Sequence, residues 1–245
     1  MYQTFIKPLY LDVKTFVLDT LFPISCLACG EEGTWICADC KSTIGKLEHQ
    51  RCIVCQKNTP FGLTHPHCQT PHGADGLISF LNYHDQKVAD ILIKGKYNFL
   101  PGIYEELGKL LAGQLKTQYP NILISNISLI PVPLHSTRKR WRGFNQAEVL
   151  CRSLSEQLNL PVADVLQRKK ITKTQKDLKK DARLKNVDGA FALSPWALNH
   201  KSEVLNHPFI LVDDVTTTGA TLAEAAKVLK RNGAAKVICL TVARD

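Results

Sequence analysis

From residue 76 onward, short apolar runs alternate with longer stretches in which apolar residues recur every three or four positions. Short apolar runs bounded by glycine or polar residues predict buried strands, and the longer spacing predicts amphipathic helices. We expect strands over 76–83, 127–134, 209–215 and 236–243, and helices over about 85–96, 101–118, 145–159 and 220–232. Strands that alternate with helices predict a parallel α/β sheet, which binds ligands beyond the carboxyl ends of its strands.

The same pattern assigns two helix ends and two isolated cysteines. Asn145 is a suitable N-cap for the third predicted helix, and Gly233 is a suitable residue just after the end of the fourth. Cys151 and Cys239 occupy apolar positions of a predicted helix and strand. We therefore expect both cysteines to be small buried side chains.

Residues 160–207 interrupt the alternation. The segment is rich in Lys, Gln and Asp near its start, has no sustained apolar period, and contains Pro161 and Pro195. A long, poorly patterned stretch inside a compact domain is usually a functional or a disordered loop. We therefore expect a loop here.

Residues 1–24 predict a helix packed against the body of the protein, because their apolar side chains recur on one helical face. Asp12, Lys14 and Asp19 interrupt the segment, and no basic stretch leads into an uninterrupted apolar run. The segment is therefore expected to be neither a signal peptide nor a membrane span. We expect a cytoplasmic protein with no membrane insertion.

Seven of the nine cysteines lie between positions 26 and 68, mostly as C-x2-C pairs, a spacing typical of zinc knuckles. In a reducing cytoplasm such thiolates bind zinc rather than pair as disulfides. The first four form a complete ligand set: Cys26, Cys29, Cys37 and Cys40. The second set has three further cysteines and one histidine: Cys52, Cys55, His65 and Cys68.

Three alternatives stay open for this module, which we assign to residues 25–73. His67 and His72 are rivals of His65 as the eighth ligand. The first and third cysteine pairs can also share a metal, and the module can hold one zinc ion or two. Because the module is too small to fold without metal, we expect its zinc to be structural.

The motif "ILVDDVTTTGAT" ends the third predicted strand and combines two features of a phosphorylated-sugar site. A strand that ends at Val215 and a helix that begins near Ala220 leave the threonines at the positive end of the helix dipole, where they can bind phosphate. Gly219 lets the backbone close around the anion without a Cβ. Asp213 and Asp214 would repel a phosphate unless they bind hydroxyls or a metal ion of the same ligand. A ribose 5-phosphate satisfies both features.

This motif resembles the 5-phosphoribosyl-1-pyrophosphate (PRPP) motif of type I phosphoribosyltransferases: a hydrophobic run, two acids, a hydrophobic residue, then T-T-T-G-x-T. The resemblance implies a type I phosphoribosyltransferase fold for residues 74–245. It also implies that Asp213 and Asp214 are the catalytic acids on the ribose hydroxyls, with magnesium on the pyrophosphate. The implied contacts of the 5-phosphate are Thr216, Thr217, Thr218, Gly219, Ala220 and Thr221.

The stretch "PVPLHSTRKRWRGFNQAEVL" follows the second predicted strand, so it is expected at the same carboxyl edge. Trp141 interrupts its cations and Phe144 lies nearby, which fits either a pyrophosphate clamp or a stacking surface for single-stranded nucleic acid. A solvated basic turn is the simplest alternative. The four cations are Arg138, Lys139, Arg140 and Arg142.

Together, "PVPLH", "RGFNQ" and the threonine motif resemble the ComF family, the phosphoribosyltransferase-like proteins of bacterial natural competence. The cysteine-rich start and "TKTQKDLKKDARLKNVDGAFAL" match the same family. The matching positions in that segment are Gln175, Leu178, Arg183, Asn186, Val187 and Phe191. The resemblance implies a cytoplasmic role after DNA import. It leaves contact with single-stranded DNA, and with helicase-like or recombination-mediator proteins, open.

A basic loop over 165–186 is expected to close over the pyrophosphate. It would exclude the water that intercepts an oxocarbenium-like state at C1. Arg183, Lys179 and Lys180 are candidates for contact with the pyrophosphate. A disordered surface loop is the alternative.

A formal net charge of +9 favours anionic partners, and three functions agree with it. The first is a transferase that acts on PRPP with an unknown acceptor. The second is a PRPP-binding sensor without turnover. The third is a DNA-binding adapter that uses the zinc module and the basic stretch. No general base is evident, so the sequence supports ligand binding better than turnover.

Overall fold

The computed structural model describes residues 23–123, 126–170 and 187–245, and divides the chain into two compact units, residues 1–43 and 44–245. In the smaller unit, a loop closed by an antiparallel bridge between Ser25 and Glu32 leads into α2 (Ala38–Thr43). The helix expected over residues 1–24 lies almost entirely outside the described residues.

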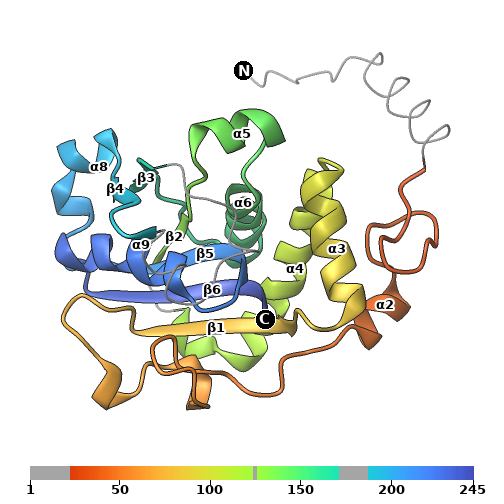
Figure 1. Cartoon of the computed structure of the whole chain (residues 1–245), viewed down its shortest axis with the longest axis horizontal. Helices are drawn as coiled ribbons and strands as arrows, with labels where there is room; N and C mark the ends of the chain where they lie inside the picture. Colours follow the sequence, from red (N-terminus) through yellow and green to blue (C-terminus); the bar gives the residue numbers. More distant parts are fainter. Residues whose placement is uncertain (1–22, 124–125, 171–186) are drawn as a thin grey trace, which may run out of the picture. The chain divides into compact units, whose positions relative to one another are not determined.

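A four-stranded parallel sheet forms the centre of the larger unit, as predicted (Figure 1). Its strand order is β1-β6-β5-β2, and every neighbouring pair is parallel. The strands are β1 (Gly76–Asn82), β2 (Ser128–Pro131), β5 (Pro208–Thr216) and β6 (Lys236–Arg244). Because all four run in one direction, the two acids and the start of the threonine motif lie at the same edge as the end of β2.

Four helices lie close to their predicted ranges: α3 (Gln86–Tyr97), α4 (Pro101–Gln118), α6 (Gln146–Leu158) and α9 (Ala220–Arg231). The Asn145 side chain accepts a hydrogen bond from the Ala147 N–H at 3.2 Å, which confirms it as the N-cap of α6. Gly233 follows the end of α9 with a φ of +91°, a conformation that favours glycine.

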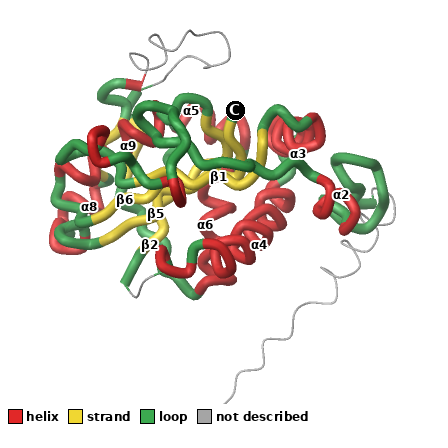
Figure 2. The backbone as a smooth tube through the Cα atoms, turned by 90° about the horizontal axis from the view of Figure 1, so that it is seen from below, coloured by secondary structure: helices red, strands yellow, loops and turns green. Residues whose placement is uncertain are grey.

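Helices cover both faces of the sheet (Figure 2). Leu222 and Leu229 of α9 share one core cluster with Leu211 of β5 and Cys239 of β6. Strand residues alternate between faces, so the intervening residues point to the other side. There α4 and α6 pack against each other, and α6 packs on β2 and β5. Cys239 and Cys151 are both fully buried, as predicted.

The prediction of a loop over 160–207 is wrong for much of the described part of this segment. That part holds an antiparallel pair, β3 (Leu166–Arg168) with β4 (Phe191–Leu193), and α8 (Pro195–Asn199). Elements of three to five residues are too short to produce an apolar period, so the sequence pattern missed them. The seven-residue α5 (Ser136–Arg142), in the basic stretch, was not predicted as a helix either, because Trp141 is its only large apolar residue.

Short 3₁₀ turns complete the described part: η1 (Pro60–Gly62), η2 (Pro66–Cys68), η3 (Pro120–Ile122) and η5 (Lys201–Glu203). Among the described helices, none combines the length and the apolar character needed to cross a bilayer.

Candidate functional site

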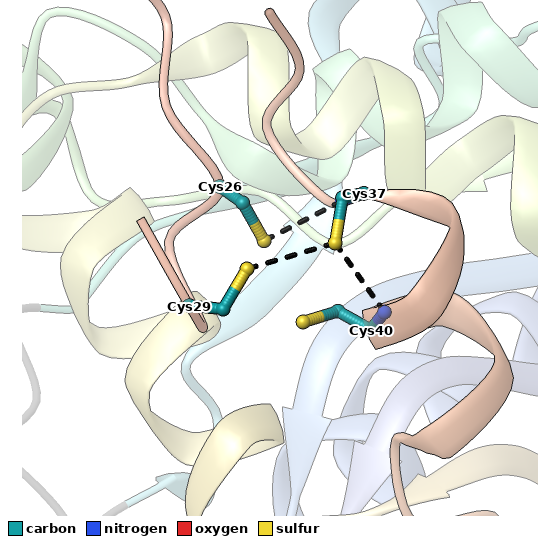
Figure 3. A group of neighbouring side chains, drawn as sticks. All are labelled: Cys26, Cys29, Cys37 and Cys40. Atoms are coloured by element: carbon teal, nitrogen blue, oxygen red, sulfur yellow. Dashed lines mark hydrogen bonds between the residues drawn. The ribbon is translucent and has the colours of Figure 1, made fainter. Parts of the chain in front are cut away.

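The first cysteine set gathers in the smaller unit, where the four side chains point toward a common centre (Figure 3). All four sulfur atoms lie within 4.8 Å of one another, and those of Cys29 and Cys37 are 3.6 Å apart. Burial raises the pKa of Cys26, but N–H groups of the backbone, led by that of Cys37, outweigh it and lower the pKa to about 6. Tetrahedral zinc with bonds of about 2.3 Å requires sulfurs roughly 3.8 Å apart, so this set fits a structural zinc ion.

The second set gathers in the larger unit from Cys52, Cys55, His65 and Cys68, whose ligand atoms also lie within 4.8 Å of one another. His65 presents Nδ1 to the Cys55 sulfur at 3.3 Å, and its Nε2 lies 3.1 Å from the carbonyl oxygen of Asn58. A hydrogen bond on the second ring nitrogen is what orients a metal-binding histidine. This set therefore also fits a structural zinc ion.

Two alternatives from the sequence can be compared with this geometry. Each described set consists of ligands consecutive in the chain, so the structure does not interleave the two pairs of knuckles. His67 stacks on His65 with ring centroids 5.2 Å apart, but it is not a member of the ligand group.

The paired acids lie near the carboxyl end of β5. The Asp214 carboxylate forms an ion pair with Lys96 at the end of α3, with Nζ and Oδ2 2.8 Å apart. Burial and the neighbouring Asp214 charge raise the pKa of Asp213 to about 7, although Lys96 and Arg168 partly offset the rise. Asp214 is therefore paired with a lysine, whereas Asp213 exchanges a proton near neutral pH.

A cavity of about 220 Å³ opens beside these acids. Two residues of the predicted cation cluster, Arg138 and Arg142 of α5, line it together with both acids and Thr221 at the start of α9. The structure thus brings part of the basic stretch to the carboxylates and to the threonine motif. This combination of hydroxyl acceptors and anion-binding guanidinium groups suits a phosphorylated, hydroxylated ligand.

The other predicted cations do not lie in this cavity. Lys139 turns toward α6, where its Nζ binds both carboxylate oxygens of Glu148 at 2.7 and 2.9 Å. Arg140 is exposed on α5. Arg183, with Lys179 and Lys180, lies outside the described residues.

Two cations near the acids were missed from the sequence. Lys96 belongs to an otherwise ordinary amphipathic helix, and Arg168 lies on the three-residue strand β3. Arg168 also packs over the ring of Phe191, with its guanidinium carbon 5.2 Å from the ring centroid. Neither belongs to a motif, so no local signal marked them.

The threonine loop, which we define as residues 216–219, connects β5 to α9. Gly219 has a φ of +79° and caps α9, and the Ala220 N–H approaches the Thr218 hydroxyl oxygen at 3.4 Å. The loop therefore presents the positive end of a helix beside the two acids. The carbonyl oxygen of Thr216 accepts a hydrogen bond from the Asp245 N–H at 3.0 Å, which ties the loop to the end of β6.

The Cys52–Cys55 knuckle packs directly against the threonine loop. Gln56 Nε2 donates to the carbonyl oxygen of Thr218 at 3.2 Å, and a Cβ added to Gly219 would lie only 2.8 Å from Ile53 Cγ1. Gln56 Oε1 accepts from Nη2 of the fully buried Arg244 at 2.6 Å. Sequence spacing did not predict this contact, because the knuckle and the loop are far apart in the chain.

Comparison with known proteins agrees with both parts of this architecture. The model of the phosphoribosyl transferase domain matches residues 145–245, and that of the double zinc ribbon domain matches residues 17–69. Competence protein ComFC of Bacillus subtilis is 28% identical over 218 residues, which cover 86% of this chain and 84% of the relative. The chain is thus similar to ComF-type competence proteins over most of its length, and both domains match.

Two further relatives match over a shorter part. Competence protein F of Haemophilus influenzae is 38% identical over 118 residues, 48% of this chain and 50% of the relative. DNA utilization protein YhgH of Escherichia coli strain K12 is 39% identical over 110 residues, 44% of this chain and 45% of the relative. These matches span about half the length of each relative or less.

The two domain matches confirm the predicted fold class, a type I phosphoribosyltransferase domain with an N-terminal double zinc ribbon. The ribbon match crosses the boundary between the two compact units. Its first ligand set lies in the smaller unit and its second in the larger one, against the threonine loop.

Proposed function

We propose that this chain binds PRPP together with Mg²⁺ in the cavity beside Asp213 and Asp214. The observation that carries the proposal is the convergence of two carboxylates, two arginines and the start of α9 on one cavity. A carboxylate accepts hydrogen bonds from ribose hydroxyls, and guanidinium groups bind phosphate oxygens in pairs. The phosphoribosyl transferase match supports the same ligand.

Each part of the cavity has a distinct role in this proposal. Thr216–Thr221 bind the 5-phosphate through backbone N–H groups and hydroxyls, with the helix dipole favouring the anion. Asp213 and Asp214 accept hydrogen bonds from the ribose hydroxyls, and Lys96 forms an ion pair with Asp214. Carboxylate oxygens are also the ligands that Mg²⁺ prefers, and the ion would neutralise part of the pyrophosphate charge.

The arginines complete the site. Arg138 and Arg142 reach the cavity from α5 and Arg168 reaches it from β3, so three positive charges face the side that the pyrophosphate would occupy. The names of the relatives, which refer to competence and DNA utilization, support a role in handling DNA after uptake. Two thiolate-rich sets that fit zinc support a reducing compartment, the cytoplasm, for this role.

Isothermal titration calorimetry of PRPP with Mg²⁺ tests the site. We expect saturable binding by the wild type and by the matched control Asp164→Asn, which changes an exposed acid. Asp214→Asn should bind about 10- to 100-fold more weakly, because a hydrogen bond to a charged group contributes about 1.5–3 kcal/mol.

A wild type that shows no PRPP binding would overturn the proposal. Unchanged binding by Asp214→Asn would move the ligand to another site. Because Asp214→Asn also removes the carboxylate partner of the partly buried Lys96 ammonium, the melting temperature is measured in parallel.

A further inference from the structure

Three exposed aromatic side chains lie at or next to this cavity, and none of them is among the proposed PRPP contacts. Tyr97 at the end of α3, Phe99 just after it, and Trp141 of α5 are 46%, 46% and 58% exposed. The Trp141 ring lies 6.2 Å from the Tyr97 ring and 5.4 Å from the Phe99 ring, centroid to centroid, at steep angles of 69° and 66°. A cluster of large aromatics left open to water marks a binding surface.

The backbone holds one member of this cluster in an unusual conformation. Phe99 has a φ of +57°, in the left-handed region that bulky side chains rarely adopt. Such conformations persist where the surrounding structure requires them, and they concentrate at functional sites. Here the strained residue presents its ring to Trp141 rather than to the core.

Positive charge surrounds the same cluster. Trp141 is flanked on α5 by Arg140, which is exposed, and by Arg142, which lines the PRPP cavity. Tyr97 lines that cavity as well, so one continuous surface runs from the paired acids to Trp141. Flat rings interleaved with guanidinium groups match a ligand in which bases alternate with phosphates.

We propose that Tyr97, Phe99 and Trp141, with Arg140, form a binding platform for single-stranded DNA. Bases stack on the exposed rings, and the phosphates between them contact the cations of α5. An apolar protein partner would leave these cations without counterions, whereas a DNA strand supplies one negative charge for each nucleotide. The inference rests on the proposed role in DNA handling and does not require PRPP to bind.

The test compares two strands that differ only in their bases. The probes are a fluorescein-labelled oligothymidylate of about 15 nucleotides and an abasic strand of the same length and charge, both followed by anisotropy. We expect the wild type to bind oligothymidylate at least about tenfold more tightly than the abasic strand. Trp141→Ala and Phe99→Ala should lose about tenfold for oligothymidylate and leave the affinity for the abasic strand unchanged.

Trp196→Ala is the matched control, because Trp196 is 43% exposed, lies on α8 and stacks on His200 at 4.8 Å. It should bind both strands as the wild type does. Arg140→Ala should weaken binding of both strands and lower the slope of affinity against salt by about one charge. The aromatic variants should keep the wild-type slope.

Equal affinity of the wild type for the two strands would overturn the platform, as would equal losses in Trp141→Ala and Trp196→Ala. If Trp141→Ala does not fold, Trp141→Phe replaces it and should keep part of the preference for bases. PRPP calorimetry on the same variants separates the two proposals. Failure of PRPP binding in the wild type leaves the DNA result intact, and loss of base-dependent binding leaves the PRPP site intact.

Discussion

Gln56 connects the Cys52–Cys55 knuckle to the threonine loop, so Gln56→Ala tests whether the loop depends on the knuckle. Its Nε2 donates to the carbonyl oxygens of Thr218 at 3.2 Å and Ile53 at 2.9 Å. Its Oε1 accepts from Arg244 Nη2 at 2.6 Å. The alanine variant removes these three hydrogen bonds and deprives a fully buried guanidinium group of one acceptor.

The expected magnitude follows from these contacts. A hydrogen bond to a charged group contributes about 1.5–3 kcal/mol and a neutral one about 1 kcal/mol, and a buried donor without an acceptor adds to the cost. We expect the free energy of unfolding of Gln56→Ala to fall by about 3 kcal/mol. The hydrogen bond to Thr218 orders the threonine loop. Losing this bond costs about 1 kcal/mol, which should weaken PRPP binding about fivefold.

Two further variants separate stability from loop geometry. Gln56→Glu keeps an oxygen acceptor for Arg244 but loses the N–H donor to Thr218, so it should bind PRPP weakly with near wild-type stability. Gln50→Ala is the matched control: Gln50 makes two hydrogen bonds to the backbone of Ser79 on β1, at 2.7 and 3.0 Å. It should lower stability and leave PRPP affinity unchanged.

Urea unfolding measures stability, and calorimetry with PRPP and Mg²⁺ measures affinity. The reasoning is refuted if both Gln56 variants bind PRPP as tightly as Gln50→Ala and the wild type, because the loop would then keep its shape without the knuckle.

Three other changes test the remaining features of the site. Asp213 has a raised pKa near 7 when folded, so the folded state keeps a proton that the unfolded chain loses near pH 4, and stability should fall as pH rises between these values. The free energy of unfolding of Asp213→Asn, measured with urea, should therefore exceed that of the wild type by about 2–4 kcal/mol at pH 8 and by little at pH 4. Equal unfolding curves for the two proteins at both pH values would contradict the raised pKa. Gly219→Ala places a Cβ 2.8 Å from Ile53 Cγ1 at a positive φ, so the free energy of unfolding should fall by about 1–3 kcal/mol, partly restored by Ile53→Ala; unchanged denaturation would show that the loop moves freely. His65→Ala should reduce the zinc content, measured by inductively coupled plasma mass spectrometry, whereas His67→Ala should not; the reverse result would make His67 the ligand.

Local patterns in the sequence determined much of this protein. Apolar runs and helical spacing predicted the four parallel strands and the four long helices, because periodicity reports which side of an element faces the core. Cap residues such as Asn145 acted within one helical turn, so they too could be predicted. C-x2-C spacing marked the metal ligands for a similar reason, since each knuckle closes over a few residues. The pair of acids followed by threonines marked the carboxyl end of β5.

Only the tertiary structure decided which distant residues meet at that end. Lys96 pairs with Asp214, Arg168 reaches the acids from a three-residue strand, and Gln56 of the knuckle supports the threonine loop. Trp141 meets Tyr97 in the same way, across two helices. The partners in these contacts come from separate elements, and their approach depends on how helices and knuckles pack on the sheet. Hydrophobic periodicity specifies which face of an element is buried, but not which polar or aromatic side chains at its ends come within contact of those on another element.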